Sequence, residues 1–255
     1  MKAAVYCGTR AVYDDMVTAC KSLLVNVPVD RVFFLIEDPA FPAPLPPAVT
    51  CIDVSGQTFF PEDGPNYHTR WTWMTLMRCA LAKILPEDLD TVLYLDTDTI
   101  VDGDVSGLWD LDLEPWYFAG VREPGKSRPD FLYVNAGVAL YNLRELRESG
   151  MADRLIAALN ALRWPFPDQD ALNTLCQGRI RTLPAEYNVC DWTDPFCEKP
   201  KILHYAARND WREEPDVQRY RAASWAAVER IRGEKWPELA WDDQVRRLDG
   251  QEAEP

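Results

Sequence analysis

Two aspartates one residue apart, Asp96 and Asp98, lie between the apolar runs TVLYL and TIV. Carboxylates this close repel each other where water is partly excluded, and a cation between them removes that cost. In open parallel sheets, ligands bind at the carboxyl ends of strands, which is where this pair would lie. The pattern therefore predicts a divalent metal site, although aspartates at strand ends also serve as turn residues that bond to nearby backbone amides.

The same stretch, LDTDT, also fits the D-x-D-x-T shape of phosphatases that form a phosphoaspartate. In that chemistry the first aspartate is the nucleophile and the second is a general acid and base. The phosphatase motif usually opens its domain on the first strand, whereas several predicted strands precede Asp96 here. The phosphatase stays open as an alternative.

The elements that must position these carboxylates alternate between strands and helices. Such alternation is typical of an α/β fold with a parallel, doubly wound sheet. Strands are predicted at 2–7, 32–37, 49–54, 91–96, 116–121, 131–143 and 201–205, and helices at 13–26, 69–85, 143–162 with a break near Gly150, and 168–177. In this arrangement Asp96 ends the fourth strand.

The composition limits the classes of protein that the chain can belong to. Of its 255 residues, 47% are hydrophobic, so it can bury a core in one large α/β domain or two small ones. The net charge of -14 repels nucleic acid and anionic lipid, which excludes both as general partners. No run reaches the roughly 18 apolar residues of a transmembrane segment, and the N-terminus lacks the pattern of a secretory signal. The seven cysteines form no C-x-x-C pair, so we expect reduced thiols and a cytoplasmic protein.

Four further stretches follow YLDTDTIV in order: VNAGVALYNL, FPDQDALN, LPAEYN and ILHYA. Taken together, they make the chain resemble the glycosyltransferase family 8 enzymes, the group that contains glycogenin and bacterial lipopolysaccharide galactosyl- and glucosyltransferases. The resemblance implies a GT-A fold, which is a Rossmann-like fold of nucleotide-diphospho-sugar transferases with a mixed, mostly parallel central sheet flanked by helices. It covers residues 1–212 as a GT-A domain and leaves 213–255 as a charged, mostly helical C-terminal extension that packs on the domain or trails from it.

The resemblance also implies a retaining enzyme with a nucleotide-sugar donor, usually UDP-linked, and a manganese ion. The family's metal ligands map onto Asp96, Asp98 and His204. The residue types agree, because His204 is one of only two histidines and closes an apolar strand. Two carboxylates and one imidazole form a mixed oxygen and nitrogen set, which suits Mn²⁺ better than Mg²⁺, the second choice.

Further residues are implied at the nucleotide and the diphosphate. The resemblance places Thr9 and Tyr13 at the nucleotide, with Tyr13 stacked on the base. It departs at Arg10, which stands where the family often has an aspartate against uracil. It places Arg78, from the segment before the aspartates, in the site. The stretch HYAARNDW lacks the family lysine that contacts the diphosphate, and Arg208 is expected to replace it.

Another group of residues is implied at the sugar. The amide of Asn135 can hydrogen-bond sugar hydroxyls, and Gly137 permits close approach of the backbone. Family precedent places Asp168 on donor-sugar hydroxyls and Gln169 near the anomeric carbon. A glutamine is a poor nucleophile, so we expect a front-face route, in which the departing phosphate deprotonates the acceptor. Asn135, Asp168 and Gln169 are thus the predicted catalytic residues, and Thr97 and Gly137 are predicted to contact the donor.

The predicted function is therefore Mn²⁺-dependent transfer of a hexose from a nucleoside diphosphate sugar to an acceptor hydroxyl. The acceptor is expected to be a carbohydrate, a lipid-linked sugar or a protein. Besides the phosphatase, a second alternative is an inactive nucleotide-sugar-binding protein that kept the metal site and lost turnover. The missing lysine near Arg208 is the observation behind that alternative.

Overall fold

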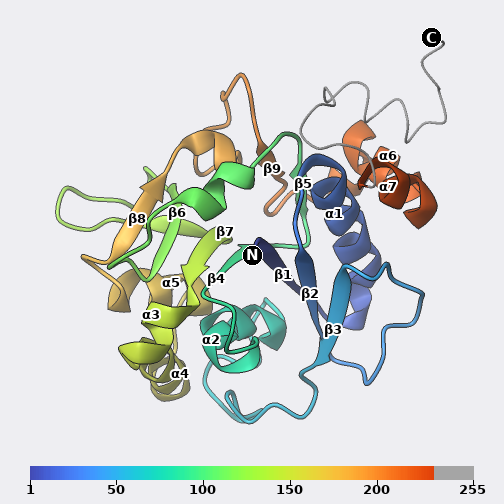
Figure 1. Ribbon diagram of the computed structural model, residues 1–255. Helices are drawn as coiled ribbons and strands as arrows, with labels where there is room; N and C mark the ends of the chain where they lie inside the picture. The colour runs from blue at the N-terminus through green and yellow to red at the C-terminus, as the bar shows by residue number, and fades with distance from the viewer. Residues whose placement is uncertain (233–255) are drawn as a thin grey trace.

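The computed structural model describes residues 1–232 and contains a seven-stranded sheet in the order β3-β2-β1-β4-β7-β6-β8 (Figure 1). Strand β7 runs antiparallel to both of its neighbours, and the other neighbouring pairs of this sheet are parallel. The predicted α/β class with a mixed, mostly parallel sheet is confirmed. The strands are β1 (Ala3–Cys7), β2 (Arg31–Ile36), β3 (Val49–Asp53), β4 (Thr91–Leu95), β6 (Phe118–Arg122), β7 (Val134–Asn142) and β8 (Ile180–Leu183).

Helices cover both faces of this sheet, because the side chains of each strand alternate between two hydrophobic cores. In β1, Ala3 and Val5 face the first core and Ala4 faces the second. Helices α2 to α5 pack on the first core, and α1, α6 and α7 pack on the second (Figure 1). The helices are α1 (Tyr13–Asn26), α2 (Leu81–Ile84), α3 (Leu143–Glu148), α4 (Met151–Ala161), α5 (Pro167–Leu175), α6 (Pro215–Ala222) and α7 (Trp225–Arg232).

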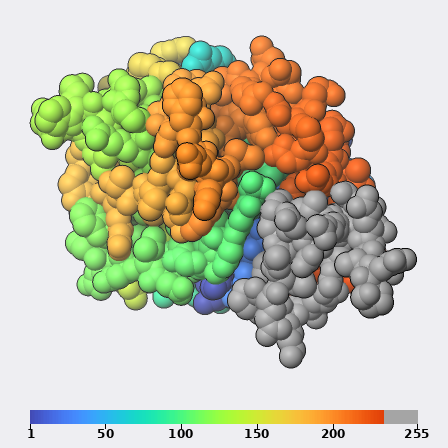
Figure 2. All heavy atoms as spheres, turned by 90° about the horizontal axis from the view of Figure 1, so that it is seen from above, coloured from blue at the N-terminus to red at the C-terminus, as the bar shows by residue number. Residues whose placement is uncertain are grey.

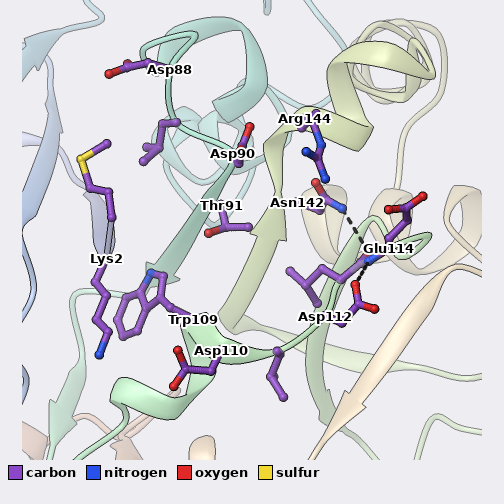
Figure 3. Close-up of a pocket in the computed structure, with 14 residues that line it drawn as sticks. Lys2, Asp88, Asp90, Thr91, Trp109, Asp110, Asp112, Glu114, Asn142 and Arg144 are labelled. Carbon is purple, nitrogen blue, oxygen red and sulfur yellow. Dashed lines mark hydrogen bonds between the residues drawn. The ribbon is translucent and has the colours of Figure 1, made fainter.

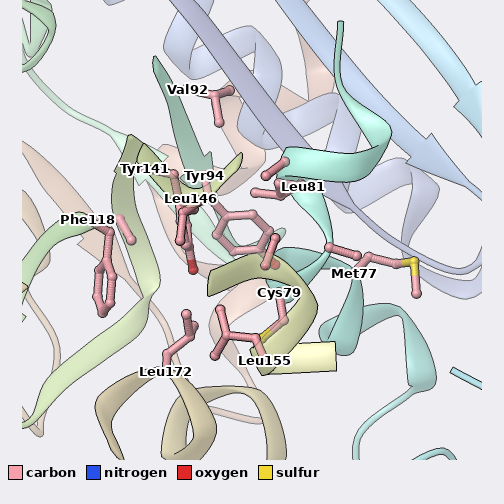
Figure 4. Close-up of a cluster of buried hydrophobic side chains, with 14 of the residues drawn as sticks. Met77, Cys79, Leu81, Val92, Tyr94, Phe118, Tyr141, Leu146, Leu155 and Leu172 are labelled. Atoms are coloured by element: carbon pink, nitrogen blue, oxygen red, sulfur yellow. The ribbon is translucent and has the colours of Figure 1, made fainter. Parts of the chain in front are cut away.

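Large aromatic side chains fill the first core beneath the central strands (Figure 4). Tyr141 of β7 stacks on Phe118 of β6 with ring centroids 5.6 Å apart, and it meets Tyr94 of β4 edge-on at 6.4 Å. Close packing of this kind holds side chains in single positions. Tyr94 is therefore fixed on the strand that leads directly to Asp96.

A second, two-stranded sheet pairs β5 (Thr99–Val101) with β9 (Ile202–His204) in antiparallel fashion. Thr99 lies opposite His204, and the N–H of Tyr205 donates to the carbonyl of Asp98 at 2.9 Å. This small ladder brings two segments that are far apart in the sequence to one end of β4.

Strand β7 bulges where it passes the end of β6. Gly120 pairs with Ala139, but Arg122, two residues later in β6, pairs with Val134, which is five residues earlier in β7 than Ala139. The extra residues of β7 are therefore pushed out of the ladder, as in the β-bulges that often lie next to active sites. The bulge carries the segment that contains Gly137 to the carboxyl edge of the parallel strands.

The predicted helix at 69–85 is wrong in form. The segment folds as a 3-10 helix, Trp73–Cys79, followed by the single turn of α2. In a 3-10 helix, residues three apart lie above one another. Arg78 donates from Nε to the carbonyl of Thr75 at 3.2 Å and from Nη1 to the carbonyl of Ala136 in β7 at 2.8 Å. These tertiary contacts accompany the tighter winding, which sequence propensity alone does not predict.

Helices α6 and α7 pack against α1 (Figure 1). Tyr220 of α6 is fully buried in the second core. Asp15 of α1, also buried, pairs with Arg212 at 2.6 Å and with Arg221 at 2.7 Å. The described part of the predicted extension 213–255 is thus packed on the domain, and its remainder lies outside the described residues. The domain boundary itself stays a prediction.

The face of the molecule seen from above is formed mainly by segments coloured green to red-orange, which belong to the chain from β5 onward (Figure 2). Within residues 1–232, no helix has both the length and the apolar character that a bilayer crossing requires.

Candidate metal and donor-sugar site

The three predicted metal ligands come together at the carboxyl end of β4. Asp96 and Asp98 follow β4, His204 ends β9, and their ligand atoms all lie within 4.8 Å of one another. His204 Nε2 is 3.4 Å from an oxygen of Asp98 and 3.7 Å from an oxygen of Asp96. The imidazole is buried and the carboxylates are partly exposed, so the group is open to solvent on its carboxylate side.

The absence of a side chain at Gly137 lets His204 and Asp96 approach each other closely. A Cβ at this position would lie 2.2 Å from Cε1 and 2.8 Å from Nε2 of His204, and 2.6 Å from Oδ2 of Asp96. Any side chain at this position would therefore displace His204, Asp96 or the strand, and glycine fits without such a shift. The space beside Gly137 faces a carboxylate oxygen and an imidazole nitrogen, which are ligand types for a divalent transition metal such as Mn²⁺. The residues present thus fit the metal that the family resemblance implies.

The protonation of these groups shows how strongly they attract positive charge. Burial lowers the pKa of His204, but the Asp98 carboxylate, a hydrogen bond with Cys190 and the charge on Asp96 together outweigh burial and raise the pKa to about 10. Burial raises the pKa of Asp98, and the charge on His204 outweighs this and lowers the pKa overall. Among the protein groups alone, a proton on the imidazole supplies the positive charge. A divalent cation bound by Asp96, Asp98 and His204 would supply that charge in place of the proton.

Arg78 links the metal ligands to the predicted sugar-binding residue Asp168. Its buried guanidinium donates to Oδ1 of Asp96 at 2.7 Å, and its Nε lies 3.0 Å from Oδ2 of Asp168. The hydroxyl of Tyr94 donates to the same oxygen of Asp96 at 2.7 Å. Burial raises the pKa of Asp168, and Arg78 partly opposes that rise. Because Arg78 and Tyr94 both bond to Oδ1 of Asp96, the oxygen of Asp96 that faces His204 is Oδ2.

A buried carboxylate, Glu123, connects the other two predicted catalytic residues. Asn135 and Gln169 each donate an amide hydrogen to Oε1 of Glu123, at 2.8 and 3.1 Å. Their carbonyl oxygens accept from the backbone of the β7 bulge instead. Gln169 accepts from the N–H of Ala136 at 2.9 Å, and Asn135 accepts from the N–H of Gly137 at 3.0 Å. The side chains are thus held by the segment that the bulge brings to the site.

The predicted nucleotide-binding residues Thr9 and Tyr13 lie just after β1. Thr9 is partly exposed, whereas Tyr13 is buried, with its ring centroid 4.8 Å from that of Phe41. The hydroxyl of Tyr13 donates to Asp38 at 3.0 Å, and Arg10 pairs with the same carboxylate. Phe41 therefore occupies the neighbourhood of the Tyr13 ring, and base stacking on Tyr13 stays a prediction.

The remaining predicted donor contacts, Thr97 and Arg208, flank the metal group in the sequence. Thr97 lies between the two aspartates and is partly exposed. Arg208 follows β9, and its guanidinium pairs with Glu214. The structure brings Arg208 to a carboxylate of the chain itself, so its replacement of the family lysine stays a prediction.

Sequence reasoning missed three residues that shape the site: Tyr94, Glu123 and Asn188. Asn188 is buried, and its Oδ1 lies 2.9 Å from Nδ1 of His204. Glu123 pairs with Lys126 at 3.2 Å. A signal for two of them was present: Asn188 ends the stretch LPAEYN, and Glu123 follows an apolar strand, as Asp96 does. The polar residue after β6 and the polar residue that ends this stretch therefore predict more of the site than the aspartate pair alone.

A hollow of about 400 Å³ lies at the opposite edge of the sheet, where β4 begins and β7 ends (Figure 3). Trp109 lines one side of it. Ligands of open α/β sheets bind at the carboxyl ends of the parallel strands, which is the other edge. The hollow is therefore separate from the candidate site. Its acidic lining residues are Asp88, Asp90, Asp110, Asp112 and Glu114.

The fold and this group of side chains define a class, the nucleotide-diphospho-sugar transferases of the GT-A fold. Comparison with known proteins agrees, since residues 49–213 match the family described as Glycosyl transferase family 8. The chain belongs to glycosyltransferase family 8.

The chain is also similar to relatives with curated names. The chain is 26% identical over 183 residues to a lipopolysaccharide 1,2-glucosyltransferase of Escherichia coli K12, which covers 60% of this chain and 54% of that protein. The fold is similar to the solved glycosyltransferase GlyE of Streptococcus pneumoniae TIGR4, with a TM-score of 0.66, 22% identity, and 89% and 62% of the two chains covered. It is equally similar to an active-site mutant of LgtC, with a TM-score of 0.66, 21% identity, and 92% and 98% covered.

The chain spans about half the length of the curated relatives that it matches, with 54%, 43% and 51% of three of them covered. The solved structures share only 22% and 21% identity with it, so they establish the fold and not the substrate. Family membership and fold are therefore secure, and the donor, the metal and the acceptor require separate argument.

Proposed function

We propose that the chain is a retaining glycosyltransferase that moves a hexose from a UDP-linked sugar to an acceptor hydroxyl with the help of Mn²⁺, or of Mg²⁺ as the second choice. The observation that carries the proposal is the convergence of Asp96, Asp98 and His204 around the space left by Gly137. Two carboxylate oxygens and an imidazole nitrogen suit Mn²⁺. Family membership supports a nucleotide-sugar donor.

Residues of the chain have separate proposed roles at this site, in metal binding and in sugar binding. When bound, the cation would neutralise the diphosphate that leaves as the sugar is transferred. Arg78 and Tyr94 hold Oδ1 of Asp96, so its other oxygen stays directed at the metal position. Arg78 also holds Asp168, the residue that we propose accepts hydrogen bonds from hydroxyls of the donor sugar.

The side chain predicted at the reacting carbon favours a front-face route. The oxygen of Gln169 accepts from the N–H of Ala136, and its nitrogen donates to Glu123. An amide engaged in this way is a weak nucleophile, unlike the carboxylate that retaining glycosidases place beside the anomeric carbon. In the front-face route, the departing phosphate takes the proton of the acceptor hydroxyl. The new bond then forms on the face from which the phosphate leaves, which retains the configuration.

The acceptor that we propose is a carbohydrate, a lipid-linked sugar or a protein hydroxyl. The name of the Escherichia coli relative, a lipopolysaccharide glucosyltransferase, supports an acceptor that is itself a glycan. We also propose the cytoplasm as the place of action, because the seven cysteines are free thiols, which reducing compartments maintain.

The phosphatase alternative loses its support. Family membership accounts for the D-x-D motif, and Oδ1 of Asp96 is already bonded to Arg78 and Tyr94. The inactive nucleotide-sugar-binding protein stays as the second candidate, because the family lysine is missing and Arg208 pairs with Glu214.

The test is release of UDP from a panel of UDP-sugars, with water as the acceptor, in Mn²⁺ or in EDTA. The variants are Asp98→Asn and a matched control, Asp104→Asn. Asp104 is exposed and accepts hydrogen bonds from Ser106, so the control removes a nearby carboxylate outside the metal group. We expect Mn²⁺-dependent release from at least one sugar, reduced at least tenfold in Asp98→Asn and unchanged in Asp104→Asn.

The outcomes separate the candidates. Mn²⁺-dependent UDP binding by calorimetry without release from any sugar, and without transfer to a panel of simple glycosides, would favour the inactive binding protein. If the protein shows no UDP binding and no UDP release from any sugar, the UDP-sugar proposal is overturned.

A further inference from the structure

We propose that Asn188 is a positioning residue that fixes which nitrogen of His204 is presented to the metal. This inference rests on the proposed metal site and concerns a residue that does not touch the metal itself. Asn188 is fully buried and bridges two side chains of the site. Its Nδ2 donates to Oδ1 of Asn135 at 2.9 Å, and its Oδ1 lies 2.9 Å from Nδ1 of His204.

The orientation of the two amides follows from a group whose role is unambiguous. The N–H of Gly137 can only donate, so the atom of Asn135 that it meets at 3.0 Å is the oxygen. The other amide atom of Asn135 is then its nitrogen, which donates to the carboxylate of Glu123 at 2.8 Å. The orientation of Asn135 is thereby set at both ends.

The orientation of Asn188 follows from that of Asn135. Because the oxygen of Asn135 accepts, the atom of Asn188 that faces it is the nitrogen, and the atom that faces His204 is the oxygen. An amide oxygen can only accept, so Nδ1 of His204 carries a hydrogen. The chain of bonds from the β7 bulge therefore leaves Nε2 of His204 as the nitrogen that faces Asp96 and Asp98.

Backbone hydrogen bonds hold Asn188 and His204 at a fixed separation. The N–H of His204 donates to the carbonyl of Val189 at 3.0 Å, and the N–H of Val189 donates to the carbonyl of Ile202 at 2.9 Å. The residue next to Asn188 is thus tied to β9 on both sides. Partners of metal-binding histidines commonly fix the ring and raise its basicity, and their loss lowers metal affinity by about 10- to 100-fold.

The first experiment is calorimetric titration of Mn²⁺ into wild type, Asn188→Ala and Asn188→Asp. The aspartate keeps an oxygen that accepts from Nδ1 but loses the Nδ2 hydrogens that Asn135 accepts, and the alanine loses both groups. The matched control is Asn66→Ala: Asn66 is also buried, and its amide bonds to the backbone of Leu159, Leu162 and Trp164. We expect the Kd for Mn²⁺ to rise about 10- to 100-fold in Asn188→Ala. We expect the Kd to recover partly in Asn188→Asp, which restores the acceptor for Nδ1 but not the donor to Asn135, and to stay unchanged in Asn66→Ala.

The second experiment does not depend on how well the Asn188 variants fold. The chain has only two histidines, so His68→Gln, at an exposed position, leaves His204 as the one imidazole. Nitrogen NMR of this variant with Zn²⁺, which binds imidazole readily, identifies the nitrogen that carries hydrogen. We expect a protonated Nδ1 and a metal-bound Nε2.

Each other result overturns the inference. A metal-bound Nδ1 would contradict it directly. Equal losses of affinity in Asn188→Ala and Asn188→Asp would show that Asn188 acts through general structure, and unchanged affinity in both would show that it does not position His204. In these three cases the proposed function stands. If wild type binds no Mn²⁺, the proposed metal site and this inference fall together.

Discussion

The substitution Gly137→Ala tests the metal site with a single methyl group. The added Cβ would lie 2.2 Å from Cε1 of His204, and ordinary van der Waals contact begins at 3.4 Å. The imidazole or the strand must therefore shift by about 1.2 Å, the difference between the two distances. Metal sites tolerate changes in ligand distance of only about 0.2 Å. We expect the Kd for Mn²⁺ to rise by at least tenfold, because His204 and Asp96 can no longer face the same point.

Overpacking of a tightly filled site typically costs about 1 to 3 kcal/mol, so the variant should still fold. Calorimetric titration with Mn²⁺ measures the affinity, and urea unfolding in EDTA measures the stability. The control is Gly56→Ala, since a Cβ at Gly56 meets nothing within 4 Å and both properties should stay unchanged. If Gly137→Ala folds and binds Mn²⁺ as tightly as wild type, the metal does not lie between His204 and Asp96, and the assignment of the site is wrong.

Three further predictions concern stability, each measured by urea unfolding. Arg78→Met should lower the free energy of unfolding by about 3 to 5 kcal/mol, because it leaves two carboxylates without their shared buried cation; a loss below about 1 kcal/mol would contradict this. Asp102→Asn should stabilise the protein at pH 7, because burial, then Asp216, raises the pKa of Asp102 from 3.8 to about 6. The ionised form is thus disfavoured in the folded state, so the gain should be absent below pH 3.8, should grow between pH 3.8 and about 6, and should stay constant above that range; a gain independent of pH would refute that cause. Asp15→Ala should destabilise by about 1 to 3 kcal/mol, because it removes the buried partner of Arg212, the last residue of the predicted domain, and of Arg221, which follows it; no change would show that these ion pairs contribute little.

Most of the sheet could be predicted from the sequence, because strands buried on both faces appear as continuous apolar runs. The run RVFFLI of β2 is an example, and all but its first residue are buried. The pairing of the strands is different. Apolar character predicts that β7 is a strand but not that it runs antiparallel, and the mixed sheet was predicted only through the family resemblance.

The site was predictable to the extent that its chemistry is local in the sequence. The spacing of Asp96 and Asp98 shows a carboxylate pair at a strand end. His204 required the family resemblance, because its position depends on the β5–β9 ladder between distant segments. The partners of Arg78 and the role of Glu123 depend on the β7 bulge and on a 3-10 helix. Neither has a sequence signal as strong as that of an apolar run.

Because of the bulge in β7, two backbone amides of this strand are hydrogen-bonded to side chains of the site and not to a neighbouring strand. The amides of Ala136 and Gly137 donate to side-chain oxygens of Gln169 and Asn135, whereas the amides further along β7 belong to its ladders with β4 and β6. Exchange of an amide proton with solvent deuterium requires its own hydrogen bond to open. The exchange rates of these two amides therefore report whether two side chains are in place. A ligand that moves those side chains would speed the exchange of these two amide protons, while the amides of the surrounding sheet would stay protected.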